Sequence, residues 1–273
     1  MRIQYPQFII LFFLIFFSIS ISVFASDKIQ NSSHLATGLG LEQLAYEERI
    51  PEKSTVSDAT VSNWIFAFEG LKSWQNIFIG IKAVIPVVKD DGREEWKLAG
   101  NTVQTNSLEY GWTRVDGFIG YPLHHMLYPY IGLRWSEFRQ ERSDFAPLFG
   151  PPVESIETVI AKYILLGIRG GVTINQSWAF GYGLEYLLPV SVEVENNAIP
   201  GWQATDVDGY TLALSGQLDY LFSEKISVSF QLTSGRNHWD GSDYLPSAQS
   251  GKWKWPENNT DYWNGMVVIK RFF

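Results

Sequence analysis

His238 lies in a polar segment, Gly235–Asp243, that reads GRNHWDGSD. Asp240 follows the histidine by two residues, and the preceding polar segment carries Asp206 and Asp208. An imidazole beside a carboxylate can take a proton from water, because its ordinary pKa lies close to neutrality. The four residues are therefore candidates for a binding rim. Asp-Gly and Asn-rich sequences are also ordinary turns, so we assign no catalytic residue.

Lys252–Trp255 alternates cation and indole in the sequence KWKW. A lysine beside an aromatic ring suits the phosphates and sugar faces of lipopolysaccharide, so Trp253 and Trp255 are candidate binding residues. A β-hairpin arm above the membrane is the alternative role for this segment. No metal is assigned, because the adjacent His124 and His125 would point to opposite faces of a strand. No cofactor is assigned either, since the sequence has no cysteine, phosphate-binding loop or nucleophile elbow.

Strands must position these residues, and two segments show the strand period most clearly. In Trp178–Val194 every second residue is large and apolar, and Tyr210–Phe222 repeats the pattern. Successive side chains of a strand point to opposite faces, so one face of each strand is continuously apolar. Mostly small or polar residues fill the other face. We therefore predict an all-β fold, an antiparallel transmembrane β-barrel that is apolar outside and polar inside.

The two ends of the chain agree with export to a membrane. Residues 1–25 carry Arg2, an apolar run and a small-residue cleavage pattern ending at Ala25, so we predict a signal peptide there and a barrel domain over 26–273. An uncleaved anchor helix is the alternative for the first segment. The terminal Phe273 resembles the C-terminal signal by which outer-membrane barrels are recognised for assembly. The expected location is the outer membrane of a Gram-negative bacterium.

Ten strands are predicted, with eight or twelve as the alternatives. Their connections alternate between short and long, which is the order of short periplasmic turns and long extracellular loops in bacterial barrels. After the signal, no apolar run approaches the roughly 20 residues of a spanning helix, so crossing requires a closed barrel. The predicted strands are Gly38–Glu48, Val61–Leu71, Asn76–Val88, Ser107–Tyr121, Tyr128–Arg139, Ile156–Thr173, Trp178–Val194, Gly209–Phe222, Lys225–Ser234 and Asp261–Phe273.

Strand phase predicts which side chains fill the lumen. A barrel of about ten strands is narrow enough for side chains to fill it, so we expect paired charges; a narrow small-solute channel is the alternative. The predicted inward set is Glu69, Lys82, Arg114, Asp116, Arg134, Arg169, Glu185, Asp219 and Lys270. The predicted lipid-facing set is Ile77, Ile79, Ile81, Ile131, Leu133, Trp135, Ile164, Leu166 and Ile168.

Charge limits the partners of the chain. The sequence has 21 basic and 29 acidic residues. Residues 1–25 hold one basic and no acidic residue, so 20 against 29 remain, a formal charge of −9. This acidic balance argues against nucleic acid as a partner. The expected partners are outer-membrane lipid, lipopolysaccharide and the barrel assembly machinery, and the extracellular ligand is left open.

Ten strands with carboxylates at the rim make the chain similar to the omptin proteases, which activate water between an Asp pair and a His-Asp couple. The resemblance is one of architecture. In that family the histidine stands on the fourth outer loop, two residues after an aspartate. Here that loop carries Asp206 and Asp208, whereas His238 belongs to the fifth. A rim protease is thus the alternative to the function we predict, a non-enzymatic outer-membrane protein that displays surface loops for binding or structural roles.

Overall fold

Strands make up the regular structure of the residues that the structure describes. The computed structural model describes residues 32–50, 54–74, 76–124, 126–147, 154–205, 207–247 and 251–273. The predicted signal peptide, residues 1–25, lies outside this described part. Within the described ranges, no helix has the length and apolar character needed to cross a membrane.

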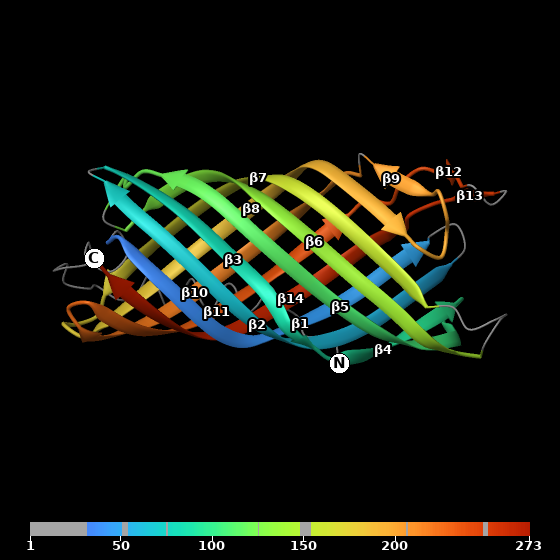
Figure 1. Cartoon of the computed structure of the whole chain (residues 1–273), viewed down its shortest axis with the longest axis horizontal. Coiled ribbons are helices and arrows are strands. Elements are labelled where there is room, and N and C mark those ends of the chain that lie inside the picture. The colour runs from blue at the N-terminus through green and yellow to red at the C-terminus, as the bar shows by residue number, and fades with distance from the viewer. Residues whose placement is uncertain are drawn as a thin grey trace.

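The strands close into one barrel, because β1 pairs with both β14 and β2. Figure 1 shows them tilted about a common long axis. β3 and β4 are separated by Asp90 alone, and each pairs with β2 and β5, so together they fill one place in the wall. The predicted ten-stranded antiparallel barrel is therefore confirmed. The wall strands are β1 (His34–Ile50), β2 (Thr55–Trp74), β3 (Ile77–Lys89), β4 (Asp91–Leu98), β5 (Asn101–Gly120), β6 (Tyr128–Ala146), β7 (Ser155–Thr173), β8 (Trp178–Asn196), β10 (Gly209–Ser223), β11 (Ile226–Trp239) and β14 (Glu257–Phe272).

The two ends of the barrel differ in their connections. Short connections and the carboxyl terminus lie at one end, the turn end, and longer connections lie at the other, the loop end (Figure 1). The loop end also carries three short strands, β9 (Gln203–Thr205), β12 (Leu245–Pro246) and β13 (Lys252–Trp253). β9 adds to β8, whereas β12 and β13 pair only with each other and stay outside the wall.

Outward-facing side chains form an apolar band between the two ends. The predicted lipid-facing residues lie on it; Ile79 and Leu133, for example, are 57% and 66% exposed. Aromatic girdles border such bands in transmembrane barrels, and both girdles are present here. The turn-end girdle contains Trp74, Tyr121, Trp178, Tyr220, Phe222 and Phe273. The loop-end girdle contains Trp64, Trp135, Tyr186 and Trp263.

The strands reach further at the loop end than the sequence predicts. Residues 91–98 and 101–106, which lie between two predicted strands, form β4 and the start of β5. Ala99 and Gly100 join these strands in a two-residue turn, and both have the positive φ that tight hairpins require, 48° and 84°. His238, also predicted in a loop, lies on β11. Beyond the apolar band the outward face is polar too, so the alternating apolar signal ends although backbone pairing continues.

Strand phase agrees with the predicted inward set, with one local correction. Arg114, Asp116 and Arg134 are buried, as predicted. The outward apolar face predicted along all of β8 stops at a bulge opposite Lys162 and Tyr163. Past this bulge Val192 and Val194 face the interior and are buried. One extra residue in a strand reverses the faces of all that follow. Pro189, which pairs with Tyr163 at the bulge, is the signal in the residue pattern, because proline inside a strand is typical of bulges.

Candidate functional site

Paired charges fill the lumen at the height of the apolar band. Arg134 donates two hydrogen bonds to Asp116, at 2.5 and 2.8 Å, and a third to Glu185 at 2.8 Å. Buried charges are tolerated when they are paired and hydrogen-bonded, so these side chains belong to the packing of the barrel. Further pairs in the lumen include Arg114–Glu42 at 2.5 Å, Lys270–Asp219 at 3.0 Å and Arg169–Glu69 at 3.9 Å.

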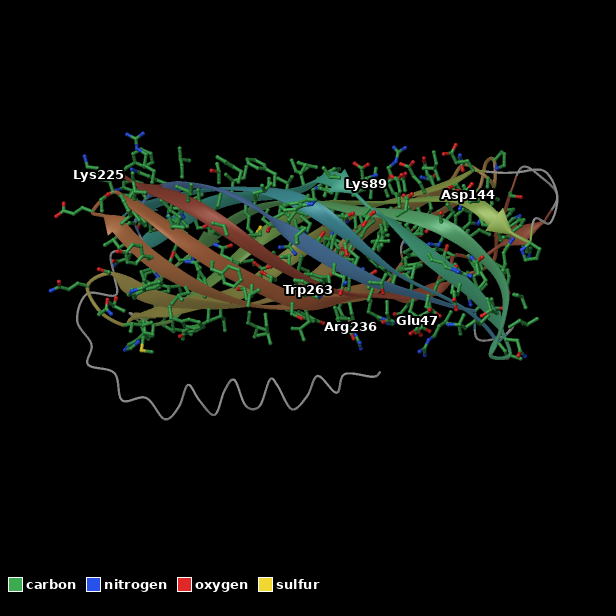
Figure 2. All side chains as sticks on the ribbon, turned by 90° about the horizontal axis from the view of Figure 1, so that it is seen from below. Glu47, Lys89, Asp144, Lys225, Arg236 and Trp263 are labelled. Atoms are coloured by element: carbon green, nitrogen blue, oxygen red, sulfur yellow. The ribbon has the colours of Figure 1, made fainter. Side chains whose placement is uncertain are left out.

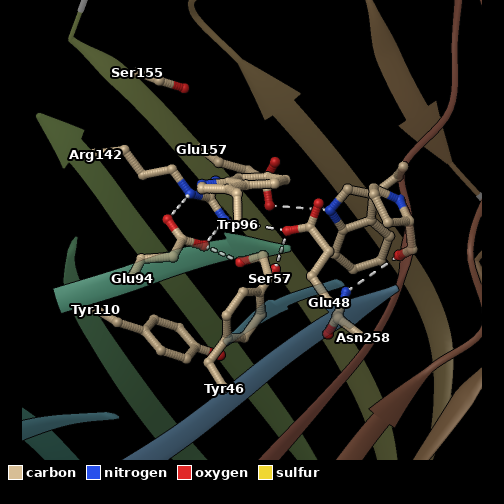
Figure 3. A network of polar contacts seen from close by, with 12 residues as sticks. Tyr46, Glu48, Ser57, Glu94, Trp96, Tyr110, Arg142, Ser155, Glu157 and Asn258 are labelled. Atoms are coloured by element: carbon tan, nitrogen blue, oxygen red, sulfur yellow. Dashed lines mark hydrogen bonds and ion pairs between the residues drawn. The ribbon is translucent and has the colours of Figure 1, made fainter. Parts of the chain in front are cut away.

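A second polar network lies in the lumen beyond the apolar band, at the loop end, and it is the candidate functional site (Figure 3). Arg142 of β6 is at its centre. The guanidinium donates to both oxygens of Glu94 on β4, at 2.8 and 3.2 Å, and to Glu48 on β1 at 3.1 Å. All three side chains are buried. The outward neighbours of Glu48 are Glu47 and Arg49, which places this part of the wall outside the apolar band.

Neutral side chains complete the hydrogen bonding of the two carboxylates. Ser57 of β2 and Asn106 of β5 both donate to Glu94, Asn106 at 2.8 Å. The Tyr46 hydroxyl donates to Glu48 at 2.5 Å. Closure of the barrel thus brings together inward positions of five strands, which come from two hairpins, β1–β2 and β4–β5, and from β6.

Glu157 of β7 adds a third carboxylate to the network. It is buried and lies directly across the strand pair from Gln140. Its Oε1 accepts a hydrogen bond from the indole Nε1 of Trp255 at 3.0 Å. In Figure 3 the carboxyl groups of Glu157 and Glu48 point toward the same space, and their charges repel each other. Three carboxylates therefore lie near one guanidinium, which forms hydrogen bonds with two of them, Glu94 and Glu48.

Burial dominates the electrostatics of this network. It raises the pKa of Glu48 to about 7, and Glu157 and Glu94 add to the increase while Arg142 opposes it. Burial also acts to raise the pKa of Glu94, but Arg142 and the hydrogen bonds around that carboxylate hold its pKa below the ordinary value. Glu94 is thus the fixed counter-ion of Arg142. Glu48 is the group that exchanges a proton near neutral pH.

A short stretch of chain covers the network from the loop end. We call residues 251–256 the cap segment. Trp255 is buried in it and packs against Trp239 of β11, with the ring centroids 6.1 Å apart. Its backbone N–H donates to Oγ of Ser242 at 2.8 Å, and the Ser242 N–H donates to the Trp255 carbonyl at 2.9 Å. The Trp202 indole donates to the Trp253 carbonyl at 3.2 Å, and β13 of the cap segment pairs with β12 outside the barrel wall.

The predicted histidine site is an outward-facing pair on the barrel wall. His238 contacts Asp240 through Nε2 at 3.0 Å and Asn259 through Nδ1 at 2.8 Å, so both ring nitrogens are engaged. Asp208 contacts this pair through its backbone, because its carbonyl accepts a hydrogen bond from the Asp240 N–H at 2.9 Å. Asp206 lies outside the described residues. The structure therefore brings His238 to one of the predicted carboxylates, away from the lumen network.

The two candidate tryptophans have different surroundings. Trp253 on β13 is 48% exposed, and beside it Nζ of Lys254 lies 5.8 Å from the ring centroid of Tyr244. Trp255 is 2% exposed and points into the lumen network. Exposed surface for a ligand is thus offered by Trp253 and its lysine neighbours, while Trp255 contacts protein.

The outer wall of the loop end is hollowed. A cavity of about 810 Å³ lies among outward side chains of β1, β2, β4, β11 and β14. Arg236 and Asp261 on its edge form two hydrogen bonds, at 2.6 and 2.7 Å. Figure 2 shows Arg236 and Glu47 on the outer wall, on the loop-end side of Trp263. The charged lining residues are Glu47, Arg49, Asp58, Arg93, Glu95, Arg236 and Asp261. We call this cavity the outer-wall hollow.

Sequence reasoning missed the lumen network. Glu94 and Arg142 lie between the predicted strands, and Glu157 lies at the edge of one, so strand phase does not place these three side chains in the lumen. The available signal was the inward parity of β1, on which Glu48 follows Leu44 and Tyr46 by steps of two. Within the described part of the chain, no three His, Cys, Asp or Glu residues are grouped to hold a metal ion.

Comparison with known proteins finds solved structures with the same fold, but no family and no curated protein that matches the sequence. No family model matches the chain, and no curated protein does. Among solved structures, the outer membrane protease OmpT from Escherichia coli matches with a TM-score of 0.65 and 11% identity, over 93% of this chain and 99% of that chain. The transport unit of the autotransporter AIDA-I from Escherichia coli matches with a TM-score of 0.44 and 9% identity, over 96% and 97%. At these identities the likeness to OmpT is one of fold.

Proposed function

We propose that the chain is an outer-membrane β-barrel that works as a binding protein at its loop end, which faces the cell exterior. In this proposal it is neither a pore nor a protease. The observation that carries the proposal is the filled lumen, with ion pairs at the height of the apolar band and the Arg142 network under its cap beyond it. A filled lumen leaves the outer wall and the exposed loops as the surfaces on which a partner can bind.

Three features support the outer membrane as the location. The apolar band is bordered by aromatic girdles, as lipid-embedded barrels require. The chain shares its fold with an outer-membrane protein, OmpT. Residues 1–25 have the pattern of a signal peptide, so the mature chain would begin near Ser26.

Lipopolysaccharide is the partner that the loop-end surface suits best. Lys252 and Trp253 are exposed on the hairpin, where cation and indole can meet phosphate and sugar. The outer-wall hollow adds Arg49, Arg93 and Arg236 at the height just beyond the loop-end girdle, where lipid headgroups lie. No ion pair between described residues includes Arg93, so its guanidinium is available to a phosphate.

The test is binding of purified lipopolysaccharide to the detergent-solubilised chain. The double variant Lys252→Gln, Lys254→Gln should lose about 2 kcal/mol, or roughly thirtyfold in affinity, because each cation near an anionic lipid surface contributes about 1 kcal/mol. The matched control is Lys72→Gln, Lys225→Gln at the turn end, which should bind as the unmodified chain does. Equal affinity of both double variants would show that the β12–β13 hairpin does not bind lipopolysaccharide.

A rim protease is the second candidate, favoured by the hydrogen bond between His238 and Asp240. Its weakness is that Asn259 engages the other ring nitrogen and that the pair faces outward. We expect no peptide cleavage by cells that display the chain. If cleavage is found, and if His238→Ala folds but cleaves at least about a hundredfold more slowly, the protease replaces the binding protein as the function.

A further inference from the structure

The cap segment rests on a carboxyl cluster whose charge is not balanced within the wall. The charged and titratable groups that face Glu48 are Tyr46 of β1, Glu94 of β4, Arg142 of β6 and Glu157 of β7. Arg142 is the one cation among them. With all three carboxylates ionised, three negative charges and one positive charge leave the buried cluster at −2. Like charges repel strongly where water is excluded, so a bound proton stabilises the closed arrangement.

The cap segment is the part of this arrangement that can move most easily. Glu48, Glu94 and Arg142 belong to wall strands held on both sides by backbone pairing. Trp255 lies in the connection between β13 and β14 and reaches the cluster through one hydrogen bond, to Glu157. Repulsion between Glu48 and Glu157 is therefore relieved most easily if the cap lifts and water reaches both carboxylates.

We propose that the loop end carries a pH-sensitive latch, in which protonated Glu48 keeps the cap segment closed and ionised Glu48 releases it. Glu157 connects Glu48 to the cap segment, because it faces Glu48 and also accepts the hydrogen bond of the Trp255 indole. The Glu94–Arg142 pair stays in place in both states and keeps the wall intact. The latch would control access to the inside of the loop end. It does not depend on the ligand that the exposed surface binds, so a failed lipopolysaccharide experiment leaves it unaffected.

The sign and size of the effect follow from proton linkage. The closed state holds the pKa of Glu48 at about 7, whereas a solvated carboxyl of an open state has the ordinary value of 4.5. The closed state thus binds the proton more tightly, and its advantage is complete below 4.5 and is lost as pH rises toward 7. The opening equilibrium, proportional to (1 + 10^(pH−4.5))/(1 + 10^(pH−7)), should increase about tenfold from pH 6 to pH 8.5 and about seventyfold from pH 5.

Hydrogen exchange of the Trp255 indole N–H measures this opening directly. The protein is studied by NMR in detergent micelles, and the Trp255 indole signal is assigned with the variant Trp255→Phe. The exchange rate is divided by that of the exposed Trp253 indole, which removes the intrinsic effect of pH. We expect this ratio to rise about tenfold from pH 6 to pH 8.5. A ratio that stays constant from pH 5 to pH 8.5 would overturn the latch.

Two variants identify the group that titrates. Glu48→Gln cannot ionise, so its ratio should be low and independent of pH, whereas the outward neighbour Glu47→Gln should behave as the unmodified chain does. A rise in Glu48→Gln equal to that of the unmodified chain would assign the latch to another group and contradict the proposal. If Glu48→Gln does not fold, Glu157→Gln removes the repulsive partner, and its rise should be clearly smaller than tenfold; an unchanged rise would again contradict the proposal.

Discussion

Arg134 shows at the scale of one residue why the lumen stays filled. Its guanidinium makes three hydrogen bonds to two carboxylates, Asp116 and Glu185. Asp116 is almost fully buried, so its negative charge is compensated inside the lumen by this arginine. Removing one partner of a buried pair leaves an uncompensated charge, which costs far more than the pair itself contributes.

We therefore expect Arg134→Met to lower the free energy of unfolding by about 3–5 kcal/mol. The matched control is Arg139→Met on the same strand, which removes an outward pair with Glu141 and should cost at most about 1 kcal/mol. Urea unfolding from lipid vesicles, followed by tryptophan fluorescence, measures both. Equal losses in the two variants would mean that the lumen charges do not support one another.

At the scale of the strand, β8 carries the strongest pattern and the most informative error. From Trp178 to Val190 its even-numbered residues face outward, and Leu184 lies near the middle of the apolar band. Leu184→Arg should cost about 2–4 kcal/mol, because an arginine at the bilayer midplane is poorly solvated. Glu193→Arg, on the same strand and outward face but past the band, should change the free energy of unfolding little. A similar cost for both would place the band elsewhere on the strand.

The barrel was predictable from the sequence because lipid imposes a strict two-residue period on every strand that crosses it. The period gave the ten strands, the inward charges such as Asp219 and the outward rows such as Ile77 and Ile79. The two-residue period no longer predicts structure in the parts of the strands that lie beyond the apolar band. Both faces of β4 are mostly polar, so the alternating pattern does not predict this strand. The bulge that turns Val192 inward is marked by a single residue, Pro189, while the apolar alternation around it continues.

The candidate site was less predictable because its partners are set by barrel closure. Glu48 and Arg142 are 94 residues apart and meet only because β1 and β6 face each other across the lumen. Sequence reasoning favoured residues near one another in the chain, such as His238 and Asp240, and that pair does form a hydrogen bond. Its outward direction depends on the phase of β11 beyond the apolar band, where the residue pattern gives no guide.

The whole molecule is expected to act as a closed barrel. Ion pairs occupy the lumen at the height of the apolar band, and the cap segment covers the loop end. Reconstituted in a planar lipid bilayer at pH 6, the protein should show no steady single-channel conductance. A porin of about sixteen strands, reconstituted in the same way, is the positive control, because barrels of that size enclose water. Stable open steps in this chain would favour the small-solute channel.

The proposed orientation, with the barrel in the outer membrane and its loop end outside, can be tested directly because the chain has no cysteine. Lys252→Cys places a single thiol at the exposed loop end, and Lys225→Cys places one at the exposed turn end. Figure 2 shows Lys225 at the far end from Asp144, which lies at the loop end. Both variants are treated on intact cells with a maleimide that does not cross membranes. We expect that Lys252→Cys is labelled, and that Lys225→Cys is labelled only after the outer membrane is permeabilised. Labelling of Lys225→Cys on intact cells, with Lys252→Cys protected, would contradict the proposed orientation.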